Sequence, residues 1–170
     1  DASFDVSSGT TSHTVNAASS STALASSVNP SLFGQSVTFT ATVTSSAGTP
    51  TGTVTFKDGV ATLGTGTLNG SGLATFATSA LSVAAHSITA VYGGDASYAT
   101  STSSVLTQTV NQASTTTGLG SSANPSVSGQ TVTFTATVSA TAPGAGVPTG
   151  TVTFKDGAAT LGTGTLNGSG

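Results

Sequence analysis

The sequence predicts an all-β protein made of antiparallel β-sandwich units, with about seven short strands in each unit. Apolar and polar residues alternate with a period of two in several short runs, which is typical of strands with one buried face. Clusters of turn-forming residues, such as NPS, GTPTG, LNGSG and GGDAS, separate these runs. Because no run has a helical period, this spacing indicates two antiparallel sheets packed face to face.

Four runs carry the clearest alternation. In chain order, with the residues expected to point inward, they are SVTFTATV at 36–43 (Val37, Phe39, Ala41, Val43), GTVTFKDG at 52–59 (Val54, Phe56), LATFATS at 73–79 (Ala74, Phe76) and HSITAVY at 86–92 (Ile88, Ala90, Tyr92). The second run ends at Asp58 and Gly59, which predict a tight turn because glycine adopts positive φ without steric cost.

Long matching segments show that the sequence is repeated. Residues 52–72 and 150–170 differ at one position only. Upstream, NPSLFGQSVTFTATV at Asn29 and NPSVSGQTVTFTATV at Asn124 lie 95 positions apart, whereas the downstream copies lie 98 positions apart. The loop that contains Pro143 therefore carries three additional residues.

The register of the repeats divides the chain into three parts. DASF at residues 1–4 matches DASY at residues 95–98, so the chain opens on the end of a repeat. A repeat of about 95 residues can bury a core of its own, unlike a rung of a solenoid. We therefore predict the C-terminal strand of a preceding repeat at 1–17, a complete repeat at 18–112 and the N-terminal part of a following repeat at 113–170.

Composition argues against several classes of function. Only 4% of the residues are charged and the formal net charge is −3. Nucleic-acid binding needs several cationic side chains, and Lys57 and Lys155 are the only two in the sequence. The lack of cysteine excludes disulfides and thiolate sites, and no apolar run approaches the roughly 20 residues of a membrane helix. We expect no cofactor and no metal. Serine and threonine make up 64 of the 170 residues, and we expect their hydroxyl groups, in place of charges, to keep the surface hydrated.

The few titratable residues do not form a catalytic pattern. To act as a general base, His86 would need a nucleophile and an orienting acid within reach. Ser87, Ser97 and Asp95 could be drawn into such a set, but serine is so common here that proximity to it carries little information. We expect His86 to be a strand residue that is hydrogen-bonded near a loop. His13 is matched by no histidine in SSVLTQTV and is interpreted as a surface substitution.

The carboxylates have structural interpretations. Asp58 and Asp156 open Asp-Gly turns, where local hydrogen bonding is expected to account for them. Asp95, matched by Asp1, is expected to stabilise its loop. The alternative is an interdomain Ca²⁺ site, which would need roughly six oxygen ligands and therefore further carboxylates from a neighbouring domain.

The lysines and the Asn-Gly-Ser sequences also have structural interpretations. Lys57 and Lys155 invite comparison with the Lys-to-Asn isopeptide crosslinks of some bacterial surface sandwiches, but each precedes an Asp-Gly turn on the threonine-bearing face. We expect both to be solvated strand ends that discourage edge-to-edge pairing. Asn69 and Asn167 match the glycosylation pattern, although a hairpin Asn-Gly needs no glycan to explain it.

Four segments in a fixed order resemble bacterial Ig-like repeat domains: NPSLFGQSVTFTATV, PTGTVTFKDG, LGTGTLNGSGLATF and HSITAVYGGDASYATSTS. Such domains occur in tandem in large bacterial surface and secreted proteins. The resemblance covers essentially the whole chain and implies an Ig-like fold, an extracellular or cell-surface location and a place in a stalk, adhesin arm or cell-wall-associated array. It implies no catalytic residues. With no cysteine pair and no tryptophan, the core must consist of Phe, Val, Leu, Ile and Tyr.

We therefore predict a structural, non-enzymatic module whose partners are the neighbouring repeats of the same chain, with self-association into a fibre and polysaccharide binding as further possibilities. Strands of about seven or eight residues, rising about 3.3 Å per residue, would let each repeat extend a rod by about 35 to 40 Å. The alternative function is a carbohydrate- or ice-binding β-sandwich module that uses exposed rows of threonine. These rows are Thr38, Thr40 and Thr42, followed by Thr53 and Thr55.

The two ends of the sequence lead to a further expectation. The sequence has no initiator methionine or signal peptide and opens inside a repeat, so we expect it to be a window on a longer array. Residues 113–170 lack counterparts of residues 73–94, and this would expose Phe134 and Phe154. We expect residues 113–170 to be protease-sensitive beside a folded repeat at 18–112. Donation of the N-terminal strand of another molecule to this part is the less favoured alternative.

Overall fold

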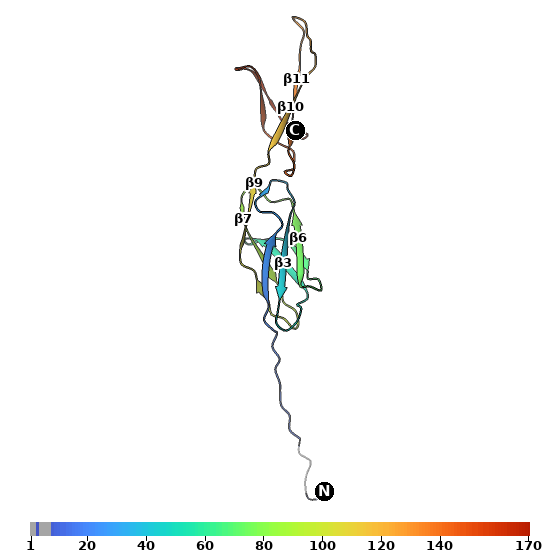
Figure 1. Cartoon of the computed structure of the whole chain (residues 1–170), viewed down its shortest axis with the longest axis vertical. Helices are drawn as coiled ribbons and strands as arrows, with labels where there is room; N and C mark the ends of the chain where they lie inside the picture. Colours follow the sequence, from blue (N-terminus) through green and yellow to red (C-terminus); the bar gives the residue numbers. More distant parts are fainter. Residues whose placement is uncertain (1–2, 4–7) are drawn as a thin grey trace.

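The computed structural model describes residue 3 and residues 8–170, and all regular structure in this part of the chain is β-strand. Figure 1 shows a closed sandwich in the middle of an elongated chain. An extended N-terminal segment leaves the sandwich at one end. The later strands β10 (Thr115–Ser121) and β11 (Phe134–Ala140) lie beyond the opposite end. The predicted all-β sandwich is confirmed.

The first sheet of the complete unit has three antiparallel strands in the order β1 (Ser21–Ser26), β3 (Val37–Thr44) and β6 (Leu73–Thr78). The central strand β3 shows the predicted alternation, because its inward side chains are almost completely buried and the threonines between them are only partly buried. The inward side chains are Val37, Phe39, Ala41 and Val43.

The second sheet faces the first and contains six strands. Its order is β2 (Ser31–Leu32), β9 (Leu106–Asn111), β7 (Ala85–Tyr92), β4 (Thr53–Asp58) and β5 (Ala61–Thr67), with β8 (Ser101–Thr102) also paired to β7. The short β2 runs parallel to β9, and the other pairs are antiparallel. The unit thus has seven strands of six or more residues and two of two residues, which fits the expected number.

The position of β4 corrects one expectation about Lys57. This strand is paired on one side with β7 and on the other with β5. Lys57 therefore lies in the interior of the sheet, where it cannot discourage edge-to-edge pairing. The alternation of residues along the chain could not reveal this, because it defines the faces of a strand and not its neighbours.

Aromatic and aliphatic side chains fill the space between the two sheets. Phe39, Phe56 and Tyr92 are completely buried, and the rings of Phe56 and Phe76 stack with centroids 5.8 Å apart. The buried Tyr92 hydroxyl donates a hydrogen bond of 2.8 Å to the carbonyl of Thr51. Burial, followed by the nearby negative charge of Asp95, raises the pKa of Tyr92. The phenol therefore stays protonated and keeps its donor role.

Two glycines allow the sheets to close along one edge. A Cβ atom on Gly64 of β5 would collide with the Phe76 ring of β6, and one on Gly66 would lie 2.7 Å from the carbonyl oxygen of Thr75. Strand β5 belongs to the second sheet and β6 to the first. The missing side chains therefore let these two edge strands approach each other and cover the core.

Residues 113–170 form two hairpins in place of a closed sandwich. The first pairs β10 with β11, and the second pairs β12 (Thr151–Asp156) with β13 (Ala159–Thr165). The second hairpin has the same register as β4–β5, including the irregularity after the phenylalanine. Within the described residues neither hairpin pairs with a third strand. Phe134 is consequently 46% exposed, whereas its counterpart Phe39 is fully buried.

Residues 8–17 precede the first contact of the chain with the sandwich and contain no strand. Residues 1–2 and 4–7, including Asp1, lie outside the described residues. The strand predicted over 1–17 therefore stays a prediction. At Ala18 the chain pairs with the Tyr98 region, since the Ala18 amide donates to the Ser97 carbonyl and the Ala99 amide donates to the Ala18 carbonyl, both at 2.8 Å.

Nothing helical in the described chain has the length and apolar character of a membrane span.

Candidate functional site

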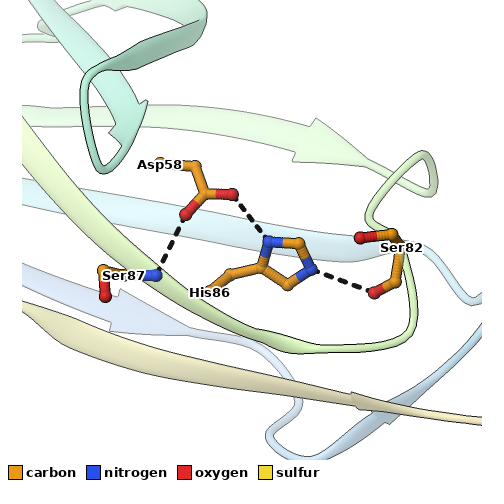
Figure 2. Close-up of polar contacts among 4 residues, drawn as sticks. All are labelled: Asp58, Ser82, His86 and Ser87. Atoms are coloured by element: carbon orange, nitrogen blue, oxygen red, sulfur yellow. Dashed lines mark hydrogen bonds and ion pairs between the residues drawn. The ribbon is translucent and has the colours of Figure 1, made fainter.

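His86 lies at the start of β7, beside the end of β4. The antiparallel pairing of these strands places Asp58 opposite Ile88, so the carboxylate reaches the imidazole of His86. The Nδ1 atom of His86 lies 2.6 Å from Oδ2 of Asp58, and Nε2 lies 2.9 Å from the carbonyl oxygen of Ser82. The other Asp58 oxygen accepts a hydrogen bond of 3.0 Å from the Ser87 amide. Figure 2 shows the ring held between Asp58 and Ser82.

This environment favours the protonated form of His86. Each ring nitrogen faces an oxygen acceptor, and only the imidazolium has two N–H donors. Burial opposes the charge, but the Ser82 carbonyl and the Asp58 carboxylate outweigh it and raise the pKa of His86. With both nitrogens occupied, the ring has no free position to accept a proton from a nucleophile. Ser82 contributes its carbonyl oxygen and not its hydroxyl.

The pair confirms one expectation and corrects another. His86 is indeed a strand residue hydrogen-bonded near a loop. The local explanation of Asp58 is wrong, because its partners lie 28 and 29 positions away in the sequence. Asp156, the counterpart of Asp58 on β12, is exposed and makes no side-chain hydrogen bond within the described residues. An Asp-Gly turn alone therefore does not create this site.

Asp95 organises the loop between β7 and β8. Its Oδ1 atom accepts hydrogen bonds of 2.8 Å from the amides of Ser97 and Tyr98. Its Oδ2 atom accepts bonds from the Thr51 hydroxyl at 2.6 Å and the Thr51 amide at 3.0 Å. The Thr51 hydroxyl, followed by the backbone donors, holds the pKa of Asp95 well below its usual range. The expected role in stabilising the loop is confirmed.

No group of three or more His, Asp or Glu side chains that could hold a metal occurs among the described residues. The two Asn-Gly sequences have turn roles. The Asn69 side-chain oxygen accepts hydrogen bonds from the amides of Ser71 and Leu73. That of Asn167 accepts one from the amide of Ser169. His13 is exposed, as expected for a surface residue.

Gln108 forms a buried polar cluster that the sequence interpretation missed. Its side chain is fully buried in β9 and has a partner for each polar atom. The oxygen accepts a bond from Ser26, and the nitrogen donates to the oxygens of Val28, Ser31 and Thr109. The sequence could have predicted that Gln108 is buried, because the period of two places it on the same inward face as Val110. A glutamine at that position needs buried partners.

The predicted threonine rows do not form one surface. Thr38, Thr40 and Thr42 belong to β3 of the first sheet, whereas Thr53 and Thr55 belong to β4 of the second. Each row points away from the core, so the two rows face opposite sides of the sandwich. Consecutive strands in the sequence here lie in different sheets, and this separates the rows.

A different threonine array does exist on the outer side of the second sheet. The β4–β5 register places Thr53 beside Thr67 and Thr55 beside Thr65. Lys57 lies between Thr62 on β5 and Thr89 on β7. We call this surface the threonine face; it consists of Thr53, Thr55, Thr62, Thr65, Thr67 and Thr89. The same pairs recur on the second hairpin, where β12 lies beside β13.

The chain is similar to one protein family and to one set of solved modules. The sequence profile of the bacterial Ig-like domain (group 3) family matches residues 24–111 and 119–170. Among solved structures, the fibronectin(III)-like modules of Clostridium thermocellum CbhA match at 24% identity with a TM-score of 0.43, over 53% of this chain and 94% of that chain. No curated protein sequence matches. Because the profile spans most of the sequence, the chain belongs to the bacterial Ig-like domain family, group 3.

Proposed function

We propose that the chain is a non-catalytic structural segment of an extracellular bacterial protein, where it acts as a stalk. The observation that carries this proposal is the path of the chain. It enters the complete sandwich at one end and leaves at the other (Figure 1), and only residues 112–114 connect β9 to β10. Units joined in this way add length along one direction. Bacterial Ig-like domains are often found in extracellular proteins, which supports the proposed location.

The hydrogen bonds of the polar residues support a structural role. Both nitrogens of His86 and both oxygens of Asp95 are occupied by bonds within the fold. Within the described residues, no buried side-chain nitrogen or oxygen lacks a hydrogen-bond partner. A general base needs a ring nitrogen free to reach the reacting group, and both nitrogens of His86 already face acceptors within the fold. These polar groups instead hold loops and strands together.

Small-angle X-ray scattering of the full chain tests the stalk. We expect a pair-distance distribution with an early maximum and a long tail, as an elongated particle gives. A dilution series provides the control, because end-to-end association would make the tail depend on concentration. A symmetric, compact distribution at all concentrations would contradict the proposal.

The threonine face supports a second candidate function, contact with ice or polysaccharide. Its paired threonines present hydroxyl and methyl groups at about 6.8 Å along each strand and about 4.8 Å between strands, without an intervening aromatic side chain. We expect Thr65→Arg in the full chain to abolish any ice-recrystallisation inhibition or polysaccharide retention. Thr75→Arg, on the outer side of the first sheet, is the matched control. Equal activity in both variants would exclude this face.

A further inference from the structure

The loop of residues 141–150, between β11 and β12, contacts the preceding unit. The Ala145 amide donates a hydrogen bond of 3.0 Å to the carbonyl oxygen of Phe33. A Cβ atom on Gly146 would lie 3.3 Å from Cε1 of the Phe33 ring. The loop backbone therefore lies directly against this phenylalanine, which is still 44% exposed.

Gly34 shows how closely the two units approach. A Cβ atom at this position would lie 2.5 Å from the carbonyl oxygen of Ala145. Its counterpart in the following unit, Gly129, has the same kind of backbone, with φ of 84° against 76° for Gly34. A Cβ atom on Gly129 would meet nothing within 4 Å. Both glycines suit the turn, but only Gly34 also makes room for a neighbouring unit.

The same loop also contacts the linker between the units. A Cβ atom on Gly144 would collide with Cβ of Ala113, and the Thr141 amide donates a hydrogen bond of 2.8 Å to the Ser114 carbonyl. Between the linker and Phe33 the two units enclose a groove of about 360 Å³. The loop is thus in contact with the linker on one side and with the preceding unit on the other.

The three additional residues distinguish this loop from its counterpart in the complete unit. The shorter loop packs within its own unit, where Ala47 accepts a hydrogen bond of 3.2 Å from the Tyr98 hydroxyl. A Cβ atom on Gly48 would lie 2.6 Å from the same hydroxyl oxygen. The receiving residue differs as well, since the counterpart of Phe33 in the following unit is Ser128. The long loop and Phe33 therefore form a matched pair that is not repeated in every unit.

We propose that the surface around Phe33 and Gly34 is a docking surface for the extended loop of the next unit, and that this contact fixes the angle between the two units. The partner that fits is an Ig-like unit of the same chain with the three-residue extension. A unit with the short loop lacks the residues that reach Phe33. Joints in such a chain then differ in stiffness according to loop length. This inference rests on the proposed stalk function for its purpose, but the contact can be tested separately.

Distance measurements between two spin labels test the joint in the full chain. The chain has no cysteine, so Val60→Cys and Thr137→Cys, both exposed, place one label in each unit. We expect a narrow distance distribution. Gly34→Ala, Phe33→Ser and deletion of residues 144–146 should each widen it. Gly129→Ala is the matched control, because it introduces the same backbone strain without the contact, and it should leave the distribution unchanged.

Each result decides the proposal. A wild-type distribution as wide as that of the deletion variant would overturn it, as would equal widening by Gly34→Ala and Gly129→Ala. Far-UV circular dichroism and thermal melting confirm that the variants are folded. Scattering from the same samples separates this inference from the stalk: an elongated chain with a wide distance distribution would retain the stalk and exclude the fixed joint. A compact chain with a narrow distance distribution would retain the fixed joint and exclude the stalk.

Discussion

At the scale of single residues, the ionisable groups of the complete unit connect segments that are distant in sequence. Asp58 and His86 join the end of β4 to the start of β7, and Asp95 joins its own loop to Thr51. Charged hydrogen bonds are stronger than neutral ones, and loss of one partner leaves the other desolvated without compensation. In a chain with only 4% charged residues, these few groups have a structural task.

The raised pKa of His86 predicts that the stability of the complete unit falls as pH rises. The folded state holds the proton more tightly than the unfolded state, whose histidine has a pKa of about 6.5. The stabilisation is complete below about pH 6.5 and is lost as pH rises through the higher folded pKa. Urea unfolding between about pH 5 and pH 9 measures it. His86→Gln should remove this pH dependence.

His13 provides the control for this experiment, because it is the other histidine and is exposed. His13→Gln should keep the wild-type pH profile. An unchanged slope in His86→Gln would show that the charged His86 does not contribute to stability.

The strand position of His86 could be predicted from the sequence, but its partner could not. The alternation extends back from Ile88 to His86, which is buried in the structure and needs hydrogen-bond partners there. Whether Asp58 or Asp95 supplies them depends on the order of strands in the sheet. That order results from packing of the whole unit and leaves no local signal. The same reason explains why the partners of Gln108 were missed.

At the scale of strands, the faces were predictable and the neighbours were not. The inward residues of β3, β4 and β7 followed from alternation, because side chains on a strand point alternately to the two faces. The sequence did not show that β3 and β4 belong to different sheets, so it could not show that the two threonine rows face opposite sides of the sandwich. Nor did it show the role of Gly64, since a glycine within a strand has several explanations.

Gly64 and its counterpart Gly162 give a matched test of sheet closure. Gly64→Ala should destabilise the complete unit by about 1 to 3 kcal/mol, because the new methyl group overlaps the Phe76 ring, which is stacked on Phe56. A Cβ atom on Gly162 would meet nothing within 4 Å. Gly162→Ala should therefore change the stability of the complete unit by less than about 0.5 kcal/mol.

Tyrosine fluorescence during urea unfolding measures this effect. The chain has two tyrosines and no tryptophan, and Tyr92 and Tyr98 both lie in the complete unit, so the signal reports on that unit alone. Equal midpoints for the Gly64→Ala variant and the wild type would show that β5 and β6 are not in tight contact in solution.

At the scale of the whole molecule, one closed unit is joined to a part with an open apolar side. Strands β3 and β11 carry matching apolar residues, but Phe39 of β3 is fully buried, whereas its counterpart Phe134 of β11 is 46% exposed. An exposed Phe134 could be predicted from the repeats within the sequence, because residues 113–170 have no counterparts to residues 73–94. The sequence could not predict the contact at Phe33, because the loop insertion showed only that extra residues exist and not where they lie.

Trypsin provides a test of this contrast with an internal control. The chain has two possible cleavage sites, after Lys57 and after Lys155, within the identical sequence TVTFKDG. Lys57 lies on a strand paired on both sides, and Lys155 lies on a strand with one partner in the described chain. Proteolysis requires local unfolding of the strand. We expect native-state cleavage after Lys155 first, detected by mass spectrometry as release of residues 156–170. Comparable rates at both sites would contradict the difference in closure.

The shared register of β4–β5 and β12–β13 has a consequence for folding. The two hairpins present the same side chains in the same pairing, and their single sequence difference, Val60 against Ala158, lies in the exposed turn. Before β4 pairs with it, this edge of β7 therefore cannot distinguish its own hairpin from the copy by shape or chemistry. The two hairpins differ in their distance from β7 along the chain and in the order of synthesis, because β4–β5 leaves the ribosome before β12–β13 has been made. Synthesis from the N-terminus thus gives the correct hairpin the first opportunity to pair with β7.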